Sequence, residues 1–449
     1  MPAVLRVKPE EIDTTEKRGR YTVSVVGCGQ KGILYAMAFA ESGFKVKCVD
    51  ADQSVVKRVA KGRNLFSNRE VEAKLKSLLG TGQIAVTNDL RGAVSQSDII
   101  IMTITPRIDA KNNPDYSELE INCKHVGAAL HRDTLFVYCG TSGLGFTESV
   151  IKETLENASG LKNGQEFGIV YNPIQPSDEQ TPCFLTNQEL KVAGFDKTSL
   201  EAASIVLGTL TNKGVRKVPN VKSMELATLF SATIKDVENS LASELAILCE
   251  KAGSDYFEVS KLFDVHKPIA SPAMTDGKGL SETYILLENA ENLNTKLRLS
   301  KLARQINQEA VCHAINLTQT ALRSCGKTFR RARIAVLGSA KPGDTSVVFV
   351  RMLETKGAKA SLYDPFWAKI EHTDATPTLK KSLGEAVEGA DCLVLFLGQN
   401  QFKPLNLKKL RAVMKTPAAI VDLTGLDNPQ EIEREGFIYR GYGRSSGQK

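Results

Sequence analysis

Two segments of the chain repeat one pattern of apolar and polar positions. The first runs from the apolar stretch 21–27 through a glycine-rich turn and a helical pattern to a second apolar stretch, 45–50. The other runs in the same way from 332–338 to 359–364. Each pattern is typical of a buried strand, a tight turn, a crossover helix and a second strand. Because parallel strands need such crossovers, the sequence predicts two doubly wound α/β units.

A different pattern separates the two repeats. Apolar residues recur at a spacing of about 3.6 from 221 to 252 and again from 294 to 326, which predicts two long helices. Gly253 is well placed to end the first of them. We therefore expect an α/β protein in which two Rossmann-like, doubly wound parallel-sheet domains are joined by a long central helical segment.

The domain boundaries follow from these patterns. Strand-like runs at 98–105 and 134–140 extend the first repeat, and runs at 391–398 and 418–425 extend the second. The charged first residues are interpreted as a flexible leader. The long central helix offers a natural surface for a dimer. The predicted segments are the leader 1–20, a nucleotide-binding domain 21–215, a central helical domain 216–328 and a C-terminal Rossmann-like domain 329–449.

Composition excludes several classes of protein. The 449 residues are 42% hydrophobic and 24% charged, as in ordinary globular proteins of two or three domains. No apolar run reaches the roughly 18 residues of a membrane helix, and the first residues lack the apolar core of a secretion signal. The net charge of +7 is dispersed along the chain, so we expect neither a membrane nor a nucleic acid as a partner.

The nine cysteines and five histidines are scattered. They form no C-x-x-C pair and no Cys/His cluster, so no metal site is expected. Several cysteines lie inside apolar runs, where a free thiol behaves as a small hydrophobic group. This usage favours a reducing compartment, and we expect a cytoplasmic protein.

The turn after the first strand matches the pattern G-x-G-x-x-G at Gly27, Gly29 and Gly32. The first glycine permits the tight turn, the second lets the backbone approach a pyrophosphate, and the third allows close packing of the helix on the strand. Asp50 ends the second strand, where a carboxylate binds ribose hydroxyls and repels a 2′-phosphate. The sequence thus predicts NAD rather than NADP. A Rossmann-shaped domain that binds no nucleotide is the alternative.

Further motifs follow in the order found in one family. They are the Thr105-Pro106 pair with P-D-x-S at 114–117, the loop TSGLGFTE at 141–148, A-R-x-I-N at 303–307 and G-F-x-Y-x-G-x-G-R at 436–444. Together they make nearly the whole chain resemble the UDP-glucose/GDP-mannose dehydrogenase family. This family of nucleotide-sugar 6-dehydrogenases includes enzymes for N-acetylmannosamine. Loop 141–148 departs from the family pattern because it lacks both prolines.

The resemblance implies a two-step oxidation of a sugar C6 alcohol to a carboxylate, with NAD as oxidant and a thioester on a cysteine. It also implies that the first domain binds NAD and that the C-terminal domain binds the uridine nucleotide of a UDP-sugar. Lys31 and Lys341 either face a phosphate or point to solvent. With the turn residues included, the expected cofactor contacts are Gln30, Lys31, Thr105 and Thr141, and the expected substrate contacts are Tyr284 and Lys341.

The side chains that this family uses for chemistry are replaced. The family has a glutamate, a lysine, an asparagine, a nucleophilic cysteine and an aspartate. In chain order, these five positions fall on Ile174, Thr228, Ala232, Lys278 and Glu282. Without a thiol at position 278 the thioester route is closed, because the thiolate is the group that traps the aldehyde.

Three interpretations stay open from the sequence. In the first, the chain keeps NAD and UDP-sugar binding without turnover. In the second, it is a redox enzyme of altered chemistry, in which Lys278 forms an imine or acts as a base and Glu282 acts as acid or base. In the third, it is a structural partner that pairs with an active relative through the central helix. A homodimer through the same helix is compatible with the first two.

Overall fold

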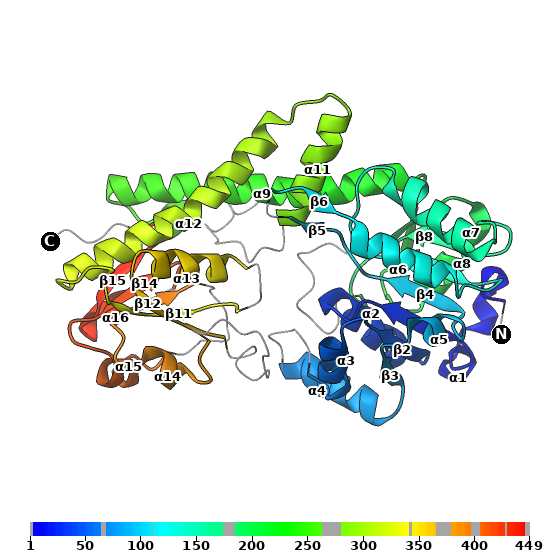
Figure 1. The fold of residues 1–449 in the computed structure, drawn as a ribbon, viewed down its shortest axis with the longest axis horizontal. Helices are drawn as coiled ribbons and strands as arrows, with labels where there is room; N and C mark the ends of the chain where they lie inside the picture. The colour runs from blue at the N-terminus through cyan, green and yellow to red at the C-terminus, as the bar shows by residue number, and fades with distance from the viewer. Residues whose placement is uncertain are drawn as a thin grey trace. The chain divides into compact units, whose positions relative to one another are not determined.

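The computed structural model describes residues 3–63, 69–109, 111–173, 185–262, 280–340, 344–364, 379–396, 405–426 and 429–444. The chain forms two compact units (Figure 1). Unit 1 comprises Met1–Ala232 and Ser281–Thr295, and unit 2 comprises Thr233–Leu280 and Lys296–Lys449.

Unit 1 is built on one large sheet. Its strands are β1 (Thr22–Val26), β2 (Lys45–Val49), β3 (Ile84–Thr87), β4 (Ile99–Met102), β7 (Leu135–Tyr138), β8 (Gly168–Tyr171), β9 (Leu190–Gly194) and β10 (Val215–Val218). Their order is β10-β9-β8-β7-β4-β1-β2-β3. The pairing is parallel throughout, except between β8 and β9. A small hairpin of β5 (Arg107–Ile108) and β6 (Pro114–Asp115) lies outside this sheet.

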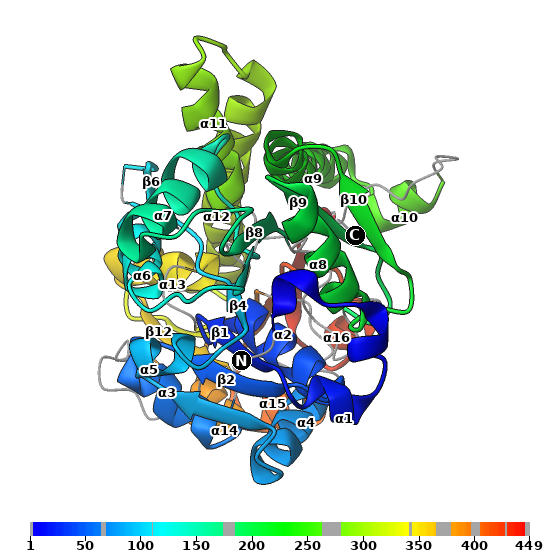
Figure 2. The ribbon, with the colours of Figure 1, turned by 90° about the vertical axis from the view of Figure 1, so that its right-hand side faces the viewer.

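Alternate residues of the strands enter two different cores. Ile99 and Ile101 of β4 lie in one core, and Ile100 and Met102 lie in the other. This alternation buries both faces of the sheet, as a parallel sheet requires. Figure 2 shows the helices on the two sides. The first core takes α2 (Gln30–Glu41), α4 (Arg69–Gly80) and α8 (Lys197–Gly208); the second takes α6 (Ser117–Gly127), a π-helical turn (Thr147–Lys152) and α7 (Glu153–Ser159).

The structure corrects the expectation that the first residues form a flexible leader. Residues 3–18 form two 3₁₀ turns, Val4–Arg6 and Pro9–Glu11, and the helical turn α1 (Thr15–Arg18). Val4, Leu5, Val7 and Ile12 are buried in the first core of unit 1. The charged residues of this segment lie mostly at its exposed positions. Because they are numerous, the sequence does not reveal the short apolar face that packs on the domain.

Unit 2 contains a second, smaller parallel sheet. Its strands are β11 (Arg333–Leu337), β12 (Lys359–Tyr363), β13 (Cys392–Leu395), β14 (Ala419–Asp422) and β15 (Ile438–Gly441), in the order β12-β11-β13-β14-β15. One face packs against α12 (Arg298–Ser324) and α13 (Thr345–Thr355). The other packs against α14 (Leu383–Val387), α15 (Leu407–Val413) and α16 (Pro429–Arg434) (Figure 1). The predicted fold class is therefore confirmed.

The central segment does not form a compact unit of its own. Helix α9 (Val221–Ala252) has 32 residues and ends before Gly253, whose φ of +77° stops a helix. Val221 and Met224 lie in the second core of unit 1, whereas Ala242 and Ala246 lie in the core of unit 2. A helix of this length, about 48 Å, has ends that pack on different cores. The range expected as a third domain is therefore divided between the two units.

The buried leader predicts a measurable contribution to stability. Leu5 packs on β8, where a Cβ added at Gly168 would lie 2.6 Å from Leu5 Cδ2. Leu5→Ala is expected to lower the free energy of unfolding by about 2–4 kcal/mol through the cavity it leaves. The exposed neighbour Arg6 gives the matched control, and Arg6→Ala is expected to change stability by less than about 0.5 kcal/mol. Urea denaturation measures both, and equal stabilities would show that the leader is not packed.

Candidate functional site

The predicted nucleotide site lies at one edge of the sheet of unit 1. The turns after β1, β4, β7 and β8 all start at the carboxyl ends of parallel strands, and Asp50 follows β2 in the same way. Because both faces of the sheet are covered by helices, this edge is where backbone and polar side chains are open to a ligand.

The glycine turn has the geometry that close approach demands. Gly27 has φ +96°, a conformation that favours glycine. A Cβ added at Gly32 would lie 1.8 Å from the carbonyl oxygen of Gly27, so only glycine lets α2 pack on β1 here. A Cβ added at Gly29 would meet nothing within 4 Å. The turn therefore leaves open space beside Gly29 at the N-terminus of α2, where the helix dipole favours an anion.

Asp50 both supports the turn and faces its ligand edge. Its Oδ2 accepts a hydrogen bond from Cys28 N at 2.8 Å, and its Oδ1 accepts one from Asp52 N at 3.0 Å. Asp50 is half-buried, and each carboxylate oxygen has a second lone pair for another donor. Thr103, which the sequence interpretation did not include, donates from Oγ1 to the carbonyl oxygen of Gly27 at 2.9 Å. Asp50 and Thr103 thus hold the turn from two sides.

The other expected cofactor residues lie along the same edge. Gln30 and Lys31 open α2, and Thr105 follows β4; all three are half-buried. Thr141 follows β7, is buried, and its Oγ1 makes no hydrogen bond within the described part of the chain.

A buried cysteine also lies at this edge. Burial raises the pKa of Cys139 to about 12, although a hydrogen bond with the Tyr35 hydroxyl and the charge of Lys31 oppose this rise. A thiol with so high a pKa is not a thiolate at neutral pH. Cys139 therefore does not replace the missing nucleophile.

The loop that follows β7 is held by two helices. Glu225 of α9 is fully buried and accepts hydrogen bonds from Gly145 N (2.6 Å), Thr147 N (3.0 Å) and Thr147 Oγ1 (2.7 Å). Asn289 of α11 (Leu280–Asn292) accepts a hydrogen bond from Leu144 N at 2.5 Å. Burial raises the pKa of Glu225, although its three donors oppose the rise. These contacts fix a loop that has no proline to stiffen it.

A polar cluster at the end of β8 includes two positions that the resemblance aligns with catalytic residues of the family. We define the Tyr171 cluster as Tyr171, Thr228, Glu225 and Glu282. Burial raises the pKa of the Tyr171 phenol, and the charges of Glu225 and Glu282 raise it further, while the neighbouring Thr228 opposes the rise. Both glutamates are buried. The phenol therefore stays protonated at neutral pH, and its hydroxyl can both donate and accept a hydrogen bond.

Thr228 and Ala232, which the resemblance aligns with the family's lysine and asparagine, both lie in α9. Thr228 Oγ1 donates to the carbonyl oxygen of Met224 at 2.8 Å, a bond within its own helix. Ala232 is buried and apolar. Asn172, just before the lost glutamate, bonds Tyr35 Oη at 2.6 Å and the carbonyl oxygen of Lys191 at 2.7 Å. Tyr284 lies half-buried in α11. Ile174, Lys278 and Lys341 lie outside the described residues.

Unit 2 has a comparable support at its first turn. Asp364 follows β12 and accepts a hydrogen bond from Ala340 N at 3.0 Å, as Asp50 does from Cys28 N. In each of the two Rossmann-like sheets, an aspartate after the second strand thus holds the turn after the first strand. Asp344, the N-cap of α13, accepts a hydrogen bond from the hydroxyl of Ser339.

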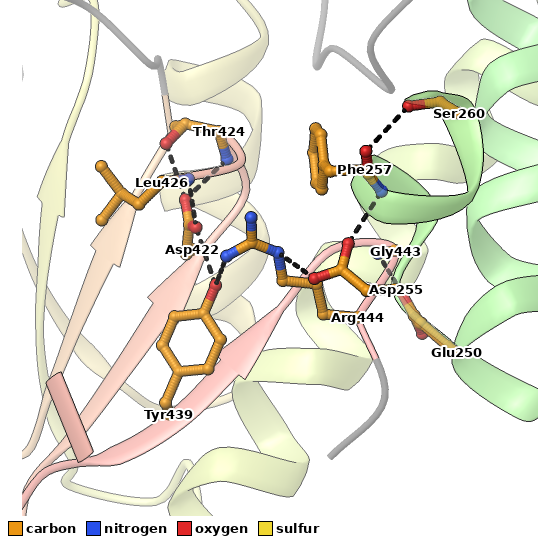
Figure 3. A network of polar contacts seen from close by, with 10 residues as sticks. All are labelled: Glu250, Asp255, Phe257, Ser260, Asp422, Thr424, Leu426, Tyr439, Gly443 and Arg444. Carbon is orange, nitrogen blue, oxygen red and sulfur yellow. Dashed lines mark hydrogen bonds and ion pairs between the residues drawn. The ribbon is translucent and has the colours of Figure 1, made fainter. Parts of the chain in front are cut away.

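A second polar network closes the carboxyl ends of β14 and β15 (Figure 3). Asp422 is fully buried and accepts from Thr424 N (2.9 Å), Thr424 Oγ1 (2.6 Å), Leu426 N (2.8 Å) and Tyr439 Oη (2.8 Å). The threonine caps Asp422 and carries no charge.

Arg444 joins this network to helix α10 (Tyr256–Lys261). Its Nη1 donates to Tyr439 Oη at 3.1 Å, and its Nε lies 3.1 Å from Asp255 Oδ2 (Figure 3). Its guanidinium carbon lies 4.8 Å from the ring centroid of Phe257. The last arginine of the G-F-x-Y-x-G-x-G-R motif is therefore built into the packing of unit 2.

Three models of one family match the chain in order. Residues 21–205 match the NAD binding domain, residues 222–309 the central domain and residues 345–428 the UDP binding domain of the UDP-glucose/GDP-mannose dehydrogenase family. The chain belongs to this family.

Individual relatives match nearly the whole length of this chain. The UDP-N-acetyl-D-mannosamine dehydrogenase of Pyrococcus horikoshii is 27% identical over 435 residues, which cover 94% of this chain and 99% of the relative. The UDP-glucose 6-dehydrogenase of Rhizobium meliloti is 24% identical over 448 residues, which cover 94% and 99%. The solved structure of the P. horikoshii UDP-D-ManNAc dehydrogenase matches with a TM-score of 0.78 at 26% identity, covering 95% of this chain and 100% of that one.

The predicted cofactor, NAD, is confirmed by the family's NAD binding domain. The residues present also fit a dinucleotide. Gly29 leaves room for a pyrophosphate at the start of α2, and Asp50 keeps a carboxylate at the position that receives ribose hydroxyls. Over the described ranges no helix combines the length and hydropathy that a membrane span requires. Those ranges also bring no three metal-binding side chains together.

Substitutions at the second and third glycines of this dehydrogenase-family turn are expected to have different effects. Gly29→Ala meets no protein atom and has an allowed backbone, so folding is expected to be unchanged. Its methyl group would occupy the space for the pyrophosphate, and NAD affinity is expected to fall at least about tenfold. Gly32→Ala, by contrast, is expected to lower the melting temperature because its Cβ meets the Gly27 carbonyl. Calorimetric titration with NAD and thermal denaturation measure both; full NAD affinity in Gly29→Ala would contradict the site.

Proposed function

We propose that this chain binds NAD and a UDP-sugar but does not carry out the cysteine-dependent oxidation to a uronic acid. The observation that carries the proposal is the hydrogen bond that Thr228 makes within its own helix. The resemblance places the oxyanion-stabilising lysine here, and the threonine hydroxyl is instead bonded to Met224 within α9. Removing one such donor typically lowers a rate by about a hundred- to a thousandfold.

Other losses support the same proposal. Ala232 offers no hydrogen bond at the asparagine position. The cysteines described in unit 1, Cys28, Cys48, Cys123 and Cys139, are all buried. A nucleophile must reach its substrate and ionise, and a buried thiol does neither.

The binding functions have separate support. Bound NAD supplies a hydride acceptor in this family. The chain contributes the glycine turn, the N-terminus of α2 and the Asp50 carboxylate, which repels the 2′-phosphate of NADP. For the nucleotide of the sugar, the support is the match of residues 345–428 to the UDP binding domain.

A redox enzyme of altered chemistry is the second candidate. The observation in its favour is Glu282, which is buried and whose charge acts on the Tyr171 phenol. A carboxylate near a polar, buried donor is a suitable acid or base. With Lys278 at the former cysteine position, such a site would oxidise an alcohol by two electrons to the aldehyde and pass the hydride to NAD.

Binding and turnover assays separate these candidates. Calorimetry is expected to show binding of NAD and of UDP-glucose or UDP-N-acetylmannosamine. NADH absorbance with the same sugars is expected to show no steady turnover. Aldehyde formation that Lys278→Ala or Glu282→Gln abolishes would instead establish the second candidate. Steady release of uronic acid would overturn the proposal, and absence of NAD binding at millimolar concentration would remove its basis.

We also propose that the chain forms a homodimer through α9. Ile234, Leu241 and Leu248 recur at intervals of one heptad and are 59%, 51% and 61% exposed. Three large apolar side chains on one stripe of an exposed helix are typical of a helix–helix interface. Pairing with a cysteine-bearing relative through the same stripe is the alternative, in which this chain is a structural partner.

A charge in the stripe is expected to break the dimer. Leu241→Asp is predicted to give a monomer in light scattering, because a carboxylate would be buried without a partner. Lys235, exposed on the same helix but off the stripe, provides the control Lys235→Ala, which is expected to stay dimeric. A wild-type monomer would contradict the homodimer, and a wild type that dimerises only with an active relative would support the alternative.

A further inference from the structure

A group of cations lies at the amino ends of the first two strands of unit 2. Two short segments run side by side there. Arg331 N donates a hydrogen bond to the carbonyl oxygen of Gly357 at 2.9 Å, and Lys359 N donates one to that of Ala332 at 2.7 Å. We define the basic strip as the exposed cationic residues of these two segments, Arg330, Arg331, Arg333, Lys356 and Lys359.

The strip is not neutralised by the edge of the sheet on which it lies. Over the described ranges, the ion pairs at this edge are those of Lys327 and Lys415 with Asp391, at 2.8 and 3.7 Å, and the five cations of the strip form none. Asp391 is buried, and it also accepts a hydrogen bond from Arg333 N at 2.8 Å. Because this carboxylate already has its partners, the strip keeps its positive charge.

A doubly wound sheet does not require these charges. Arg333 and Lys359 open β11 and β12, and they lie directly opposite each other in the register of the two strands. At the corresponding register in unit 1, Thr22 lies opposite Lys45. Like charges on directly opposed residues disfavour the pairing of strands. Since one sheet accepts this cost and the other avoids it, the charges indicate an interaction with an anionic partner.

The surroundings of the strip favour a narrow partner. Glu354 of α13 and Glu388, which follows α14, are both exposed. The two helices pack on opposite faces of the sheet, so a carboxylate lies on each side of the sheet near its amino edge. A nucleic acid duplex or a bilayer presents a broad negative surface that would also meet these carboxylates. A short extended chain can follow the strip between them.

The composition of the two segments agrees with this preference. Residues 330–333 and 356–359 include no aromatic side chain that could stack on bases and no large apolar side chain that could enter a bilayer. Duplex binding that depends on phosphates typically uses about six to ten contacts, which is more than this strip offers. Carboxylates along an extended peptide need no such area.

We propose that the basic strip binds an extended segment of a partner protein that is rich in Asp and Glu. Guanidinium groups bind carboxylates through two parallel hydrogen bonds, and exposed lysines add charge. The strip lies at the amino ends of β11 and β12, whereas the turn that Asp364 holds lies at their carboxyl ends. A partner on the strip therefore leaves that turn unobstructed. The inference goes beyond the proposed function and does not depend on it.

An acidic peptide tests the strip directly. The probe is a fluorescent oligoglutamate of about eight residues, which spans about 27 Å when extended. Fluorescence anisotropy is expected to show binding at low salt. Raising the salt from about 20 mM to about 200 mM is expected to weaken the binding at least about tenfold, because salt screens exposed charges. A peptide of the same length with glutamine in place of glutamate is expected not to bind.

Two lysines give a matched pair of variants. Lys359 and Lys45 are both exposed, and each opens the second strand of its sheet. Lys359→Gln is expected to weaken oligoglutamate binding about two- to fivefold, the effect of one exposed ion pair, whereas Lys45→Gln is expected to leave it unchanged. Arg333→Gln together with Lys359→Gln is expected to weaken binding at least about fivefold. The melting temperature of this double variant is not expected to fall, because a like-charge pair is removed.

The outcomes separate this inference from the proposed function. A wild type that fails to bind oligoglutamate, or that binds the glutamine peptide equally well, would overturn the inference. Equal losses in Lys359→Gln and Lys45→Gln would show a general effect of charge and would also overturn it. Tighter binding of duplex DNA or of phosphatidylglycerol vesicles, at equal concentration of negative charge, would replace the acidic segment by a nucleic acid or a membrane. Calorimetry with NAD is expected to give the same affinity in the wild type and in all these variants, and a wild type without NAD binding would affect the proposed function alone.

Discussion

Burial of both faces of a parallel sheet is the constraint on which this protein depends. The side chains of β4 alternate between two apolar cores: Ile99 and Ile101 lie in one, Ile100 and Met102 in the other. No side chain of this strand is therefore available to bind a ligand. The polar groups of the candidate site lie in the turns beyond the strand ends. The glycine turn, Asp50 and Thr141 all occupy that edge, because helices cover both faces of the sheet.

The same carboxylate support occurs in both units. Asp50 holds the turn after β1, and Asp364 holds the turn after β11, each by accepting a backbone N–H. At the opposite ends of the strands, Asp98 and Asp391 accept N–H bonds from the first residues of β1 and β11 at 2.8 Å. Two sheets of different size thus share one way of fixing their first strand. The family match gives them different nucleotides, NAD and UDP.

Three residues of α9 have structural roles within unit 1. Glu225 remains fully buried because it bonds the loop after β7, a structural task independent of turnover. The Thr228 hydroxyl donates a hydrogen bond within α9, and the Ala232 side chain is buried. These contacts stabilise the loop after β7 and helix α9 independently of any reaction.

The sequence alone determined four strands of each sheet, the two long helices and the nucleotide turn, because these depend on local periodicity and on glycines at a set spacing. Helix α9 was predicted with nearly its observed bounds for that reason. The leader was not: Val4, Leu5 and Ile12 are too few to show a period, and only contact with the core reveals their role. Nor did the sequence indicate that Thr103 holds the turn at Gly27, because the two residues are distant in the chain. Tertiary structure alone decided that Tyr171 and Thr228 meet, because β8 and α9 are brought together by packing and not by any pattern within either element.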